Sequence, residues 1–557
     1  MKKSNQFFSA FITLLLFSLS AFTQTKNTGY KLSKNKTWQL LDYQQDSVYG
    51  ASVNRAYNEL LKGKKSHPVI VAVIDEGVDI AQEDLKGHIW NNKKEIPGNG
   101  IDDDKNGYTD DIHGWNFLGG KNGKMIYATN SEADREYARL SPQYSTIKDS
   151  SQASDKKQYQ YFLTVKKRHR QDSAGRKEDN YTSQSNYIHQ LASADSFMQR
   201  AIQKQSVYYK DIELFQPKDS LADTIKSFLL DFFNQSSSVF ESISLDSSIK
   251  EGQEYLVKHK DELLLYEQVR NDPFELRKEI VGDDPFDIND RNYGNNIVGD
   301  KYAGHGTHCS GIIAAGRNNG IGIDGITDNV FIMPVRAVNT LHYGDETDKD
   351  LALAIRYAVD NGAKIISMSF GKDFSPQKQW VDAAVKYAGE KNILLVHAAG
   401  NNGRNIDAIS FYPNANFLGS SERAKNLITV GAISSDTGFT LVASFSNYGQ
   451  KEVDLFAPGV DIYSSVPGND YEFDSGTSMA TPVVAGIAAL ILEYYPGLTA
   501  EQLKYIIMKS VTSLKGKMVN KPGSKEKTDF STLCVSGGIV NAYKALQLAA
   551  SMTSKKR

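Results

Sequence analysis

The sequence predicts an α/β fold in which helices cover both faces of a mainly parallel sheet, joined to a mostly helical insertion. Apolar, β-branched runs without polar alternation are typical of buried parallel strands, and the run at 69–74 is the clearest of them. Such runs alternate with segments of helical period, which indicates a sheet between two helical layers. In contrast, the stretch from Met125 to Lys250 is polar, contains the single glycine Gly175, and repeats helical periods.

The predicted elements follow one another along the chain. The first strand ends at Asp75, at the carboxyl edge where α/β proteins build their sites. The glycine-bearing motif 304–311 opens a helix, and the apolar run 483–492 continues another. Between these helices lie predicted strands at 330–338, 365–371, 393–396 and 427–432, and a predicted helix at 351–361.

Composition favours an exported protein and argues against a nucleic-acid partner. The formal net charge is −2, and the one basic run, 166–170, is interpreted as a solvated face. Two lysines followed by the apolar stretch 7–22 predict a signal peptide over residues 1–23, with an uncleaved anchor as the alternative. We therefore expect a secreted or periplasmic protein with no membrane span after signal removal. The two cysteines, Cys309 and Cys534, are expected to be free thiols, with a disulfide between them as the alternative.

Three motifs carry residue types suited to nucleophilic catalysis. The string at 476–482 precedes an apolar helix, so Ser478 falls where unpaired backbone N–H groups and the positive end of the helix dipole lie. A serine hydroxyl needs a base during attack, and His305 has a suitable intrinsic pKa. Asp75 would orient the imidazole and stabilise its cation. Taken singly, each residue is better explained as a cap, a turn or a structural histidine.

Together, the motifs resemble those of the subtilisin-like serine proteases (subtilases). They are Val-Ile-Asp-Glu-Gly at 73–77, His-Gly-Thr-His-Cys-Ser-Gly at 305–311 and Gly-Thr-Ser-Met-Ala-Thr-Pro at 476–482, in the order Asp, His, Ser. The resemblance covers roughly residues 38–120 and 290–548. It implies a three-layer subtilisin-like fold and a serine endopeptidase that works through an acyl-enzyme intermediate. The alternative is a catalytically silenced scaffold protein that acts through its helical insertion.

The resemblance also implies further site residues. Asn401 would supply one oxyanion donor beside the Ser478 backbone N–H, the alternative being a simple Gly-Asn turn. One wall of the pocket for the residue before the cleaved bond would be Ser369, Phe370 and Gly371, and the other Ala398, Ala399 and Gly400, the alternative being that Phe370 is a simple core residue. A peptide or protein substrate would then bind by β-augmentation. The small residues in both walls predict an open pocket that takes large apolar side chains.

Calcium is the predicted structural cofactor. By resemblance, Asp84 and the Asn319 side chain would hold one ion. Spacing alone predicts a second site in a D-x-D-x-N-G-x-x-D loop, because alternate oxygen side chains around a glycine turn converge on a hard cation. A solvated acidic turn is the alternative, and His113 replaces the glutamate of a full EF-hand. The predicted ligands of this loop are Asp102, Asp104, Asn106 and Asp110.

Three features depart from the family pattern. Asp75 and His305 are 230 residues apart, which predicts an insertion over 121–290. We expect this insertion to bind a protein partner or make a self-inhibitory contact, unless it is only a surface bundle. Too few residues follow the signal for an ordinary prodomain, and Glu76 replaces a usual serine or threonine. The remaining boundaries are predicted at 24–120 and 291–548 for the catalytic domain and 549–557 for a tail.

Overall fold

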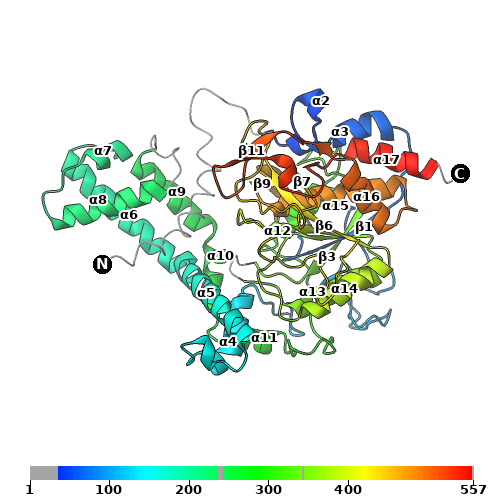
Figure 1. Cartoon of the computed structure of the whole chain (residues 1–557), viewed down its shortest axis with the longest axis horizontal. Helices are drawn as coiled ribbons and strands as arrows, with labels where there is room; N and C mark the ends of the chain where they lie inside the picture. Colours follow the sequence, from blue (N-terminus) through cyan, green and yellow to red (C-terminus); the bar gives the residue numbers. More distant parts are fainter. Residues whose placement is uncertain (1–34, 236–242, 341–343, 555–557) are drawn as a thin grey trace. The chain divides into compact units, whose positions relative to one another are not determined.

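The computed structural model describes residues 35–235, 243–340 and 344–554. The predicted signal peptide at 1–23 lies outside these ranges. The described chain forms two compact units (Figure 1). One comprises residues within 128–273, and the other comprises residues 35–127, 274–340 and 344–554. Each unit is described by itself, beginning with the second, which we call the sheet unit.

A nine-stranded sheet forms the centre of the sheet unit. Its order is β10-β13-β7-β6-β5-β4-β1-β3-β2. Neighbouring strands are parallel except β10 and β13, which are antiparallel. The strands are β1 (Val69–Asp75), β2 (Trp115–Asn116), β3 (Val330–Arg336), β4 (Ile365–Met368), β5 (Leu394–Ala398), β6 (Leu427–Ile433), β7 (Leu455–Pro458), β10 (Thr512–Ser513) and β13 (Gly538–Ile539).

Both faces of this sheet are buried, because successive residues of its strands belong to two different cores. Val71 and Val73 of β1 pack in one core, whereas Ala72 and Ile74 pack in the other. The first core contains side chains of α12 (Gly304–Ala314), α15 (Thr477–Tyr494), α16 (Ala500–Lys509) and α17 (Ala542–Ser554). The second contains those of α13 (Asp348–Asp360) and α14 (Lys378–Glu390), two helices that lie side by side in Figure 1. The predicted α/β, three-layer fold with a mainly parallel sheet is confirmed.

Short elements complete the sheet unit. Two antiparallel hairpins lie outside the main sheet, β8 (Ile462–Val466) with β9 (Asp470–Asp474) and β11 (Met518–Asn520) with β12 (Lys527–Asp529). The short helices are η1 (Trp38–Leu40), α2 (Tyr43–Asp46), α3 (Val53–Ala56), η2 (Tyr57–Leu61), η3 (Glu83–Leu85), α11 (Glu275–Ile280) and η7 (Phe530–Thr532).

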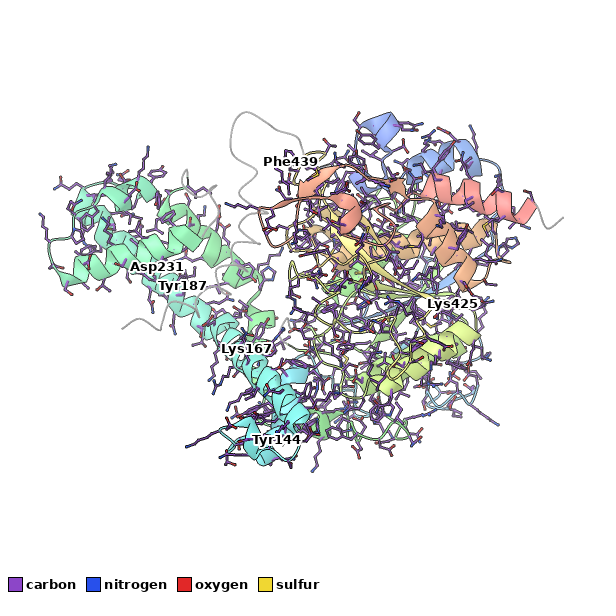
Figure 2. The ribbon with its side chains drawn as sticks, in the orientation of Figure 1. Tyr144, Lys167, Tyr187, Asp231, Lys425 and Phe439 are labelled. Atoms are coloured by element: carbon purple, nitrogen blue, oxygen red, sulfur yellow. The ribbon has the colours of Figure 1, made fainter. Side chains whose placement is uncertain are left out.

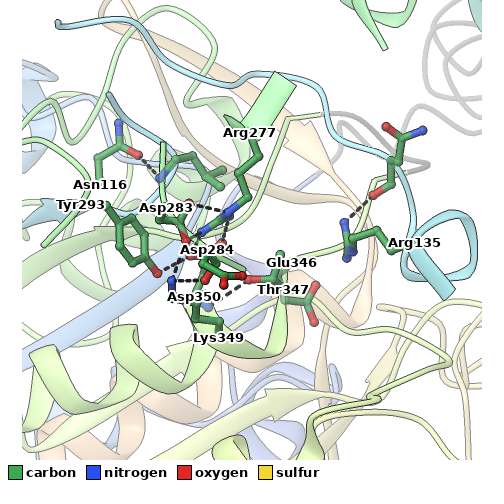
Figure 3. Close-up of polar contacts among 12 residues, drawn as sticks. Asn116, Arg135, Arg277, Asp283, Asp284, Tyr293, Glu346, Thr347, Lys349 and Asp350 are labelled. Carbon is green, nitrogen blue, oxygen red and sulfur yellow. Dashed lines mark hydrogen bonds and ion pairs between the residues drawn. The ribbon is translucent and has the colours of Figure 1, made fainter. Parts of the chain in front are cut away.

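A buried charge cluster joins the segment after Pro273 to helix α13 (Figure 3). Arg277 donates to Asp350 through two nitrogens, at 2.6 and 2.8 Å, and to Asp283 at 2.8 Å. Lys349 also donates to Asp283, at 2.7 Å, and the Tyr293 hydroxyl donates to Asp350 at 2.6 Å. The segment containing α11, inside the predicted insertion range, is therefore anchored to the sheet unit.

Helices make up the described part of the other unit, which we call the helical unit. Tyr144 ends the first helix with its ring buried, and its hydroxyl donates to Gln158 of the next at 2.6 Å. Tyr187, labelled with Tyr144 in Figure 2, belongs to the third helix. The helices are α4 (Glu132–Tyr144), α5 (Lys156–Asp179), α6 (Tyr181–Ile202), α7 (Tyr209–Leu214), α8 (Ser220–Gln235), α9 (Leu245–Lys258) and α10 (Lys260–Leu265), with short turns η4 (Ser150–Gln152) and η6 (Tyr266–Gln268).

Within the described ranges, one helix is long and apolar enough to cross a membrane. It is α15, and 89% of that stretch is buried inside the protein. Such burial is typical of the core helix of an α/β domain.

Candidate active site

The candidate site lies at the carboxyl edge of the sheet. Strands β5, β4 and β1 are neighbours and run parallel, so their final residues lie along one edge. Asp75 ends β1, Ser369 follows β4, and Ala398 ends β5. Parallel sheets place ligand sites at this edge, where residues that are far apart in the sequence lie close together.

Asp75 and His305 form a hydrogen-bonded pair. His305 lies in the first turn of α12, and its Nδ1 is 2.8 Å from Asp75 Oδ1. The same oxygen accepts the Glu76 backbone N–H at 2.8 Å, and the buried Asp75 Oδ2 has no hydrogen-bond partner within the described residues. Burial lowers the pKa of His305, but the charge and hydrogen bond of Asp75 outweigh it, and the pKa rises to about 10.

Glu76 turns its carboxylate to the start of helix α12. Its Oε1 accepts the His305 backbone N–H at 2.8 Å, where a negative group complements the helix dipole. Burial raises the pKa of Glu76 to about 8, although the neighbouring His305 lowers it. Glu76 in turn raises the pKa of His305. The residue that departs from the family pattern is thus electrostatically coupled to the imidazole.

Ser478 is the second residue of helix α15. Its hydroxyl donates to the Ser369 carbonyl at 2.9 Å, and the Ser369 hydroxyl donates to the Ser478 carbonyl, also at 2.9 Å. The buried Cys309 lies between Ser478 and the Asp75–His305 pair, because its sulfur is 3.5 Å from the Ser478 carbonyl and within 4.8 Å of ligand atoms of Asp75 and His305. The Ser478 hydroxyl proton is thus engaged by the Ser369 carbonyl.

Asn401 follows β5, and its amide has a fixed orientation. The Asn401 Oδ1 atom accepts the backbone N–H and the hydroxyl of Thr477, at 2.9 and 2.8 Å. The amide nitrogen therefore lies on the side of Ser478. A Cβ placed on Gly476 would be 3.2 Å from Asn401 Nδ2 and 3.4 Å from the Ser478 backbone nitrogen. Two N–H donors thus border the same small space beside Ser478.

The two predicted substrate walls contact one aromatic ring. A Cβ on Gly371 would lie 2.5 Å from Phe411 Cε1, and a Cβ on Gly400 would lie 2.8 Å from Phe411 Cζ. Ser369, Ala398 and Ala399 are buried, and Phe370 packs against the second core. The edge of the Phe411 ring therefore lies where a side chain on either glycine would point. The open pocket between the walls stays a prediction.

The first predicted calcium pair is in contact. Asn319 Nδ2 donates to Asp84 Oδ1 at 2.6 Å, and Asp84 Oδ2 accepts the Ile323 N–H at 3.0 Å. Its backbone carbonyl accepts the Gly316 N–H at 2.9 Å, so the loop 316–323 surrounds Asp84. The Asn319 oxygen instead accepts the Ile321 N–H at 3.0 Å. The donor set suits a hard cation, provided that the Asn319 amide turns its oxygen toward Asp84.

The second predicted calcium loop gathers a different set of ligands. Glu95, Asp102 and Asp104 offer carboxylate oxygens within 4.8 Å of one another, which fits an oxygen-binding cation. Asp110 instead accepts the N–H groups of residues 99 and 100, at 3.2 and 2.9 Å. The Asn106 oxygen accepts the Tyr108 N–H at 2.8 Å. Glu95, Asp102 and Asp104 also accept backbone N–H groups of the loop, but their carboxylates in addition face one another.

Sequence reasoning missed Phe411, Glu95 and Glu76's role at the helix start. Phe411 sits in an irregular segment, and only the pair of glycines in the facing walls hinted at a neighbouring ring. Glu95 lies outside the alternating acidic pattern, so a motif search does not reach it. Both cysteines are buried and free, as predicted.

Comparisons with known proteins add a family match. A family model described as the Subtilase family matches residues 66–523. The chain is 46% identical over 187 residues to the thermophilic serine proteinase of Bacillus sp. (strain AK1), covering 34% of this chain and 42% of that protein. It is 38% identical over 213 residues to subtilisin DY of Bacillus licheniformis, covering 38% and 71%. It is 36% identical over 245 residues to thermitase of Thermoactinomyces vulgaris, covering 44% and 75%.

Proposed function

The chain belongs to the subtilase family, and we propose that it is a serine endopeptidase that cleaves peptide bonds through Asp75, His305 and Ser478. The chain spans under half the length of the thermophilic proteinase. We therefore argue the activity from the residues of this chain and not from that relative. One observation carries the proposal: the 2.8 Å contact of His305 Nδ1 with a buried carboxylate leaves Nε2 as the basic nitrogen.

The proposed reaction proceeds in two stages. The Ser478 hydroxyl attacks the substrate carbonyl and passes its proton to His305 Nε2. The oxyanion receives hydrogen bonds from the Ser478 backbone N–H and Asn401 Nδ2. When this tetrahedral intermediate collapses, its C–N bond breaks and His305 returns the proton to the leaving amine. The acyl group remains on Ser478 as an ester. Water, deprotonated by His305, then hydrolyses this ester and regenerates the hydroxyl.

Hydrolysis of an unfolded protein substrate tests this proposal. We expect wild-type protein to cleave it, and the Ser478→Ala and His305→Ala variants to lose roughly three or more orders of magnitude in kcat. The Phe439→Ala variant is a suitable control, because Phe439 is an exposed residue outside the site (Figure 2). Equal cleavage by wild type and Ser478→Ala would refute the proposal.

We propose that calcium serves a structural role in this chain. Asp84 with Asn319 would hold one ion, and the loop containing Asp102 and Asp104 another. Glu95 supports the second site, since its carboxylate lies within 4.8 Å of the carboxylates of Asp102 and Asp104. A bound cation would offset the repulsion among these carboxylates and stabilise the loop.

We propose export from the cytoplasm and a separate role for the inserted helices. The lysines and apolar stretch before residue 24 support a secretory signal. N-terminal sequencing of the exported protein should then begin near residues 22–25.

The polar, helical character of 128–273 supports a partner-binding or self-inhibitory unit within the predicted range 121–290.

A further inference from the structure

The Phe411 ring is held firmly beside both substrate walls. Its neighbour Tyr412 exchanges backbone hydrogen bonds with Lys372, which directly follows the first wall, at 2.9 and 3.0 Å. The Phe411 carbonyl accepts Asn414 Nδ2 at 3.1 Å. The ring is 9% exposed, and its centroid is 5.9 Å from that of the buried His397. The ring position is therefore fixed by backbone pairing and packing on one side.

The same ring borders a cavity. This cavity has a volume of about 120 Å³, and its lining includes His397, Thr429, Asn414 and Glu452 as well as Phe411. Neither Gly371 nor Gly400 lines it, although a Cβ added to either glycine would meet the ring. Phe411 thus separates the cavity from the space between the walls.

We propose that Phe411 restricts this protease to small side chains at the substrate residue that supplies the scissile carbonyl. This inference rests on the proposed function. A peptide paired with both walls would direct that side chain between Gly371 and Gly400, where the Cε1–Cζ edge of the ring lies. Glycine, alanine or serine fits beside the ring, whereas leucine or phenylalanine meets it. Removing the ring would join the space to the cavity behind it.

Matched peptide substrates test the proposal. The peptides differ only at that residue, with Ala, Leu or Phe, and kcat/KM is measured for wild type and Phe411→Ala. We expect wild type to prefer Ala over Phe by roughly 10- to 200-fold, the range that a close-packed pocket achieves. Phe411→Ala should reverse this preference, and Phe411→Leu should give an intermediate ratio. The control Ile406→Ala enlarges the same cavity without removing the ring, and should keep the wild-type preference.

Two results would overturn the role of Phe411: a wild-type preference for Leu or Phe, or an unchanged ratio in Phe411→Ala. Labelling of Ser478 by a small fluorophosphonate, which needs no peptide side chain, is measured on every variant. Labelled variants with an unaltered ratio refute the role of Phe411 alone. An unlabelled, folded wild type refutes the proposed function itself.

Discussion

At the scale of single residues, the sequence predicted which residues form the candidate site but not the hydrogen bonds among them. Asp75, His305 and Ser478 could be found because each stands in a glycine-bearing motif at the start or end of an apolar run. The direction of the Ser478 hydroxyl, which donates to Ser369, depends on contacts between β4 and α15 that no local pattern encodes. Phe411 escaped for the same reason, since its partners lie 40 and 11 residues away.

Replacing Asn401 by alanine should lower kcat by about 10²- to 10³-fold and leave KM nearly unchanged, because the lost donor faces charge that develops only in the transition state. Steady-state kinetics on a peptide substrate measures both constants. Asn402→Ala is the matched control, because its exposed side chain follows Asn401 directly. A raised KM with an unchanged kcat would show instead that Asn401 binds the substrate in its ground state.

Replacing Glu76 by glutamine should shift the acidic limb of the kcat/KM–pH profile to lower pH. His305 acts as a base only when neutral, and its pKa is raised by Asp75 and, less strongly, by Glu76. Activity should therefore rise with pH through that pKa, and wild type should still be gaining activity above pH 8. Removing the Glu76 charge lowers the pKa of His305 and moves the rise downward. An unmoved limb, or one moved upward, contradicts the coupling.

At the scale of elements, the hydrophobic pattern predicted the strands of the sheet. Long-range polar contacts, which no local pattern shows, attach the segment around α11 to the sheet unit. The run at 69–74 became β1, buried on both faces. Nothing local in 274–293 indicated that Arg277 pairs with Asp350, 73 residues further on. The stretch around α11 therefore looked like the helices before it.

The cluster around Arg277 gives a stability prediction. Arg277→Ala removes the guanidinium shared by the buried carboxylates of Asp283 and Asp350, of which Asp283 keeps its ion pair with Lys349, and should cost about 3–5 kcal/mol of unfolding free energy. Urea denaturation followed by circular dichroism measures it. The control Lys425→Ala removes an ion pair with Glu501 that is 75% exposed at the lysine, and should cost under about 1 kcal/mol (Figure 2). Equal costs would contradict the structural role of the cluster.

The acidic loop gives a prediction for calcium. Chelation should lower the thermal midpoint of wild type by several degrees, because an ion bound only to the folded state stabilises it. The thermal midpoint of the double variant Asp102→Asn, Asp104→Asn should fall less on chelation. Adding calcium back should restore the original midpoint of the wild type but should not raise that of the double variant to the wild-type value. Scanning calorimetry with and without chelator makes the comparison. A wild-type midpoint that ignores both chelator and calcium refutes a structural ion.

At the scale of the whole molecule, the chain combines a complete α/β core with a helical unit of different composition. The change to a polar, glycine-poor sequence indicated the second unit, while its limits depend on packing that composition does not encode. Because the sheet unit has two hydrophobic cores of its own, it should fold without the helical unit.

Deleting residues 128–273 and joining the ends with a flexible Gly-Ser linker tests the proposed role of the helical unit. If the unit is self-inhibitory, the deletion variant should cleave a protein substrate faster than wild type does. If it assists folding, the refolding yield should fall. Unchanged yield and unchanged rates would mean that the helices are a surface bundle with neither role.

Labelling with a fluorophosphonate, followed by peptide mapping, tests the central claim most directly. We predict one covalent adduct on Ser478 in wild type, lost in Ser478→Ala and strongly slowed in His305→Ala, because only an activated hydroxyl reacts rapidly. A well-folded wild-type protein that stays unlabelled, or that carries its adduct on another residue, would contradict the catalytic assignment and favour a silenced scaffold.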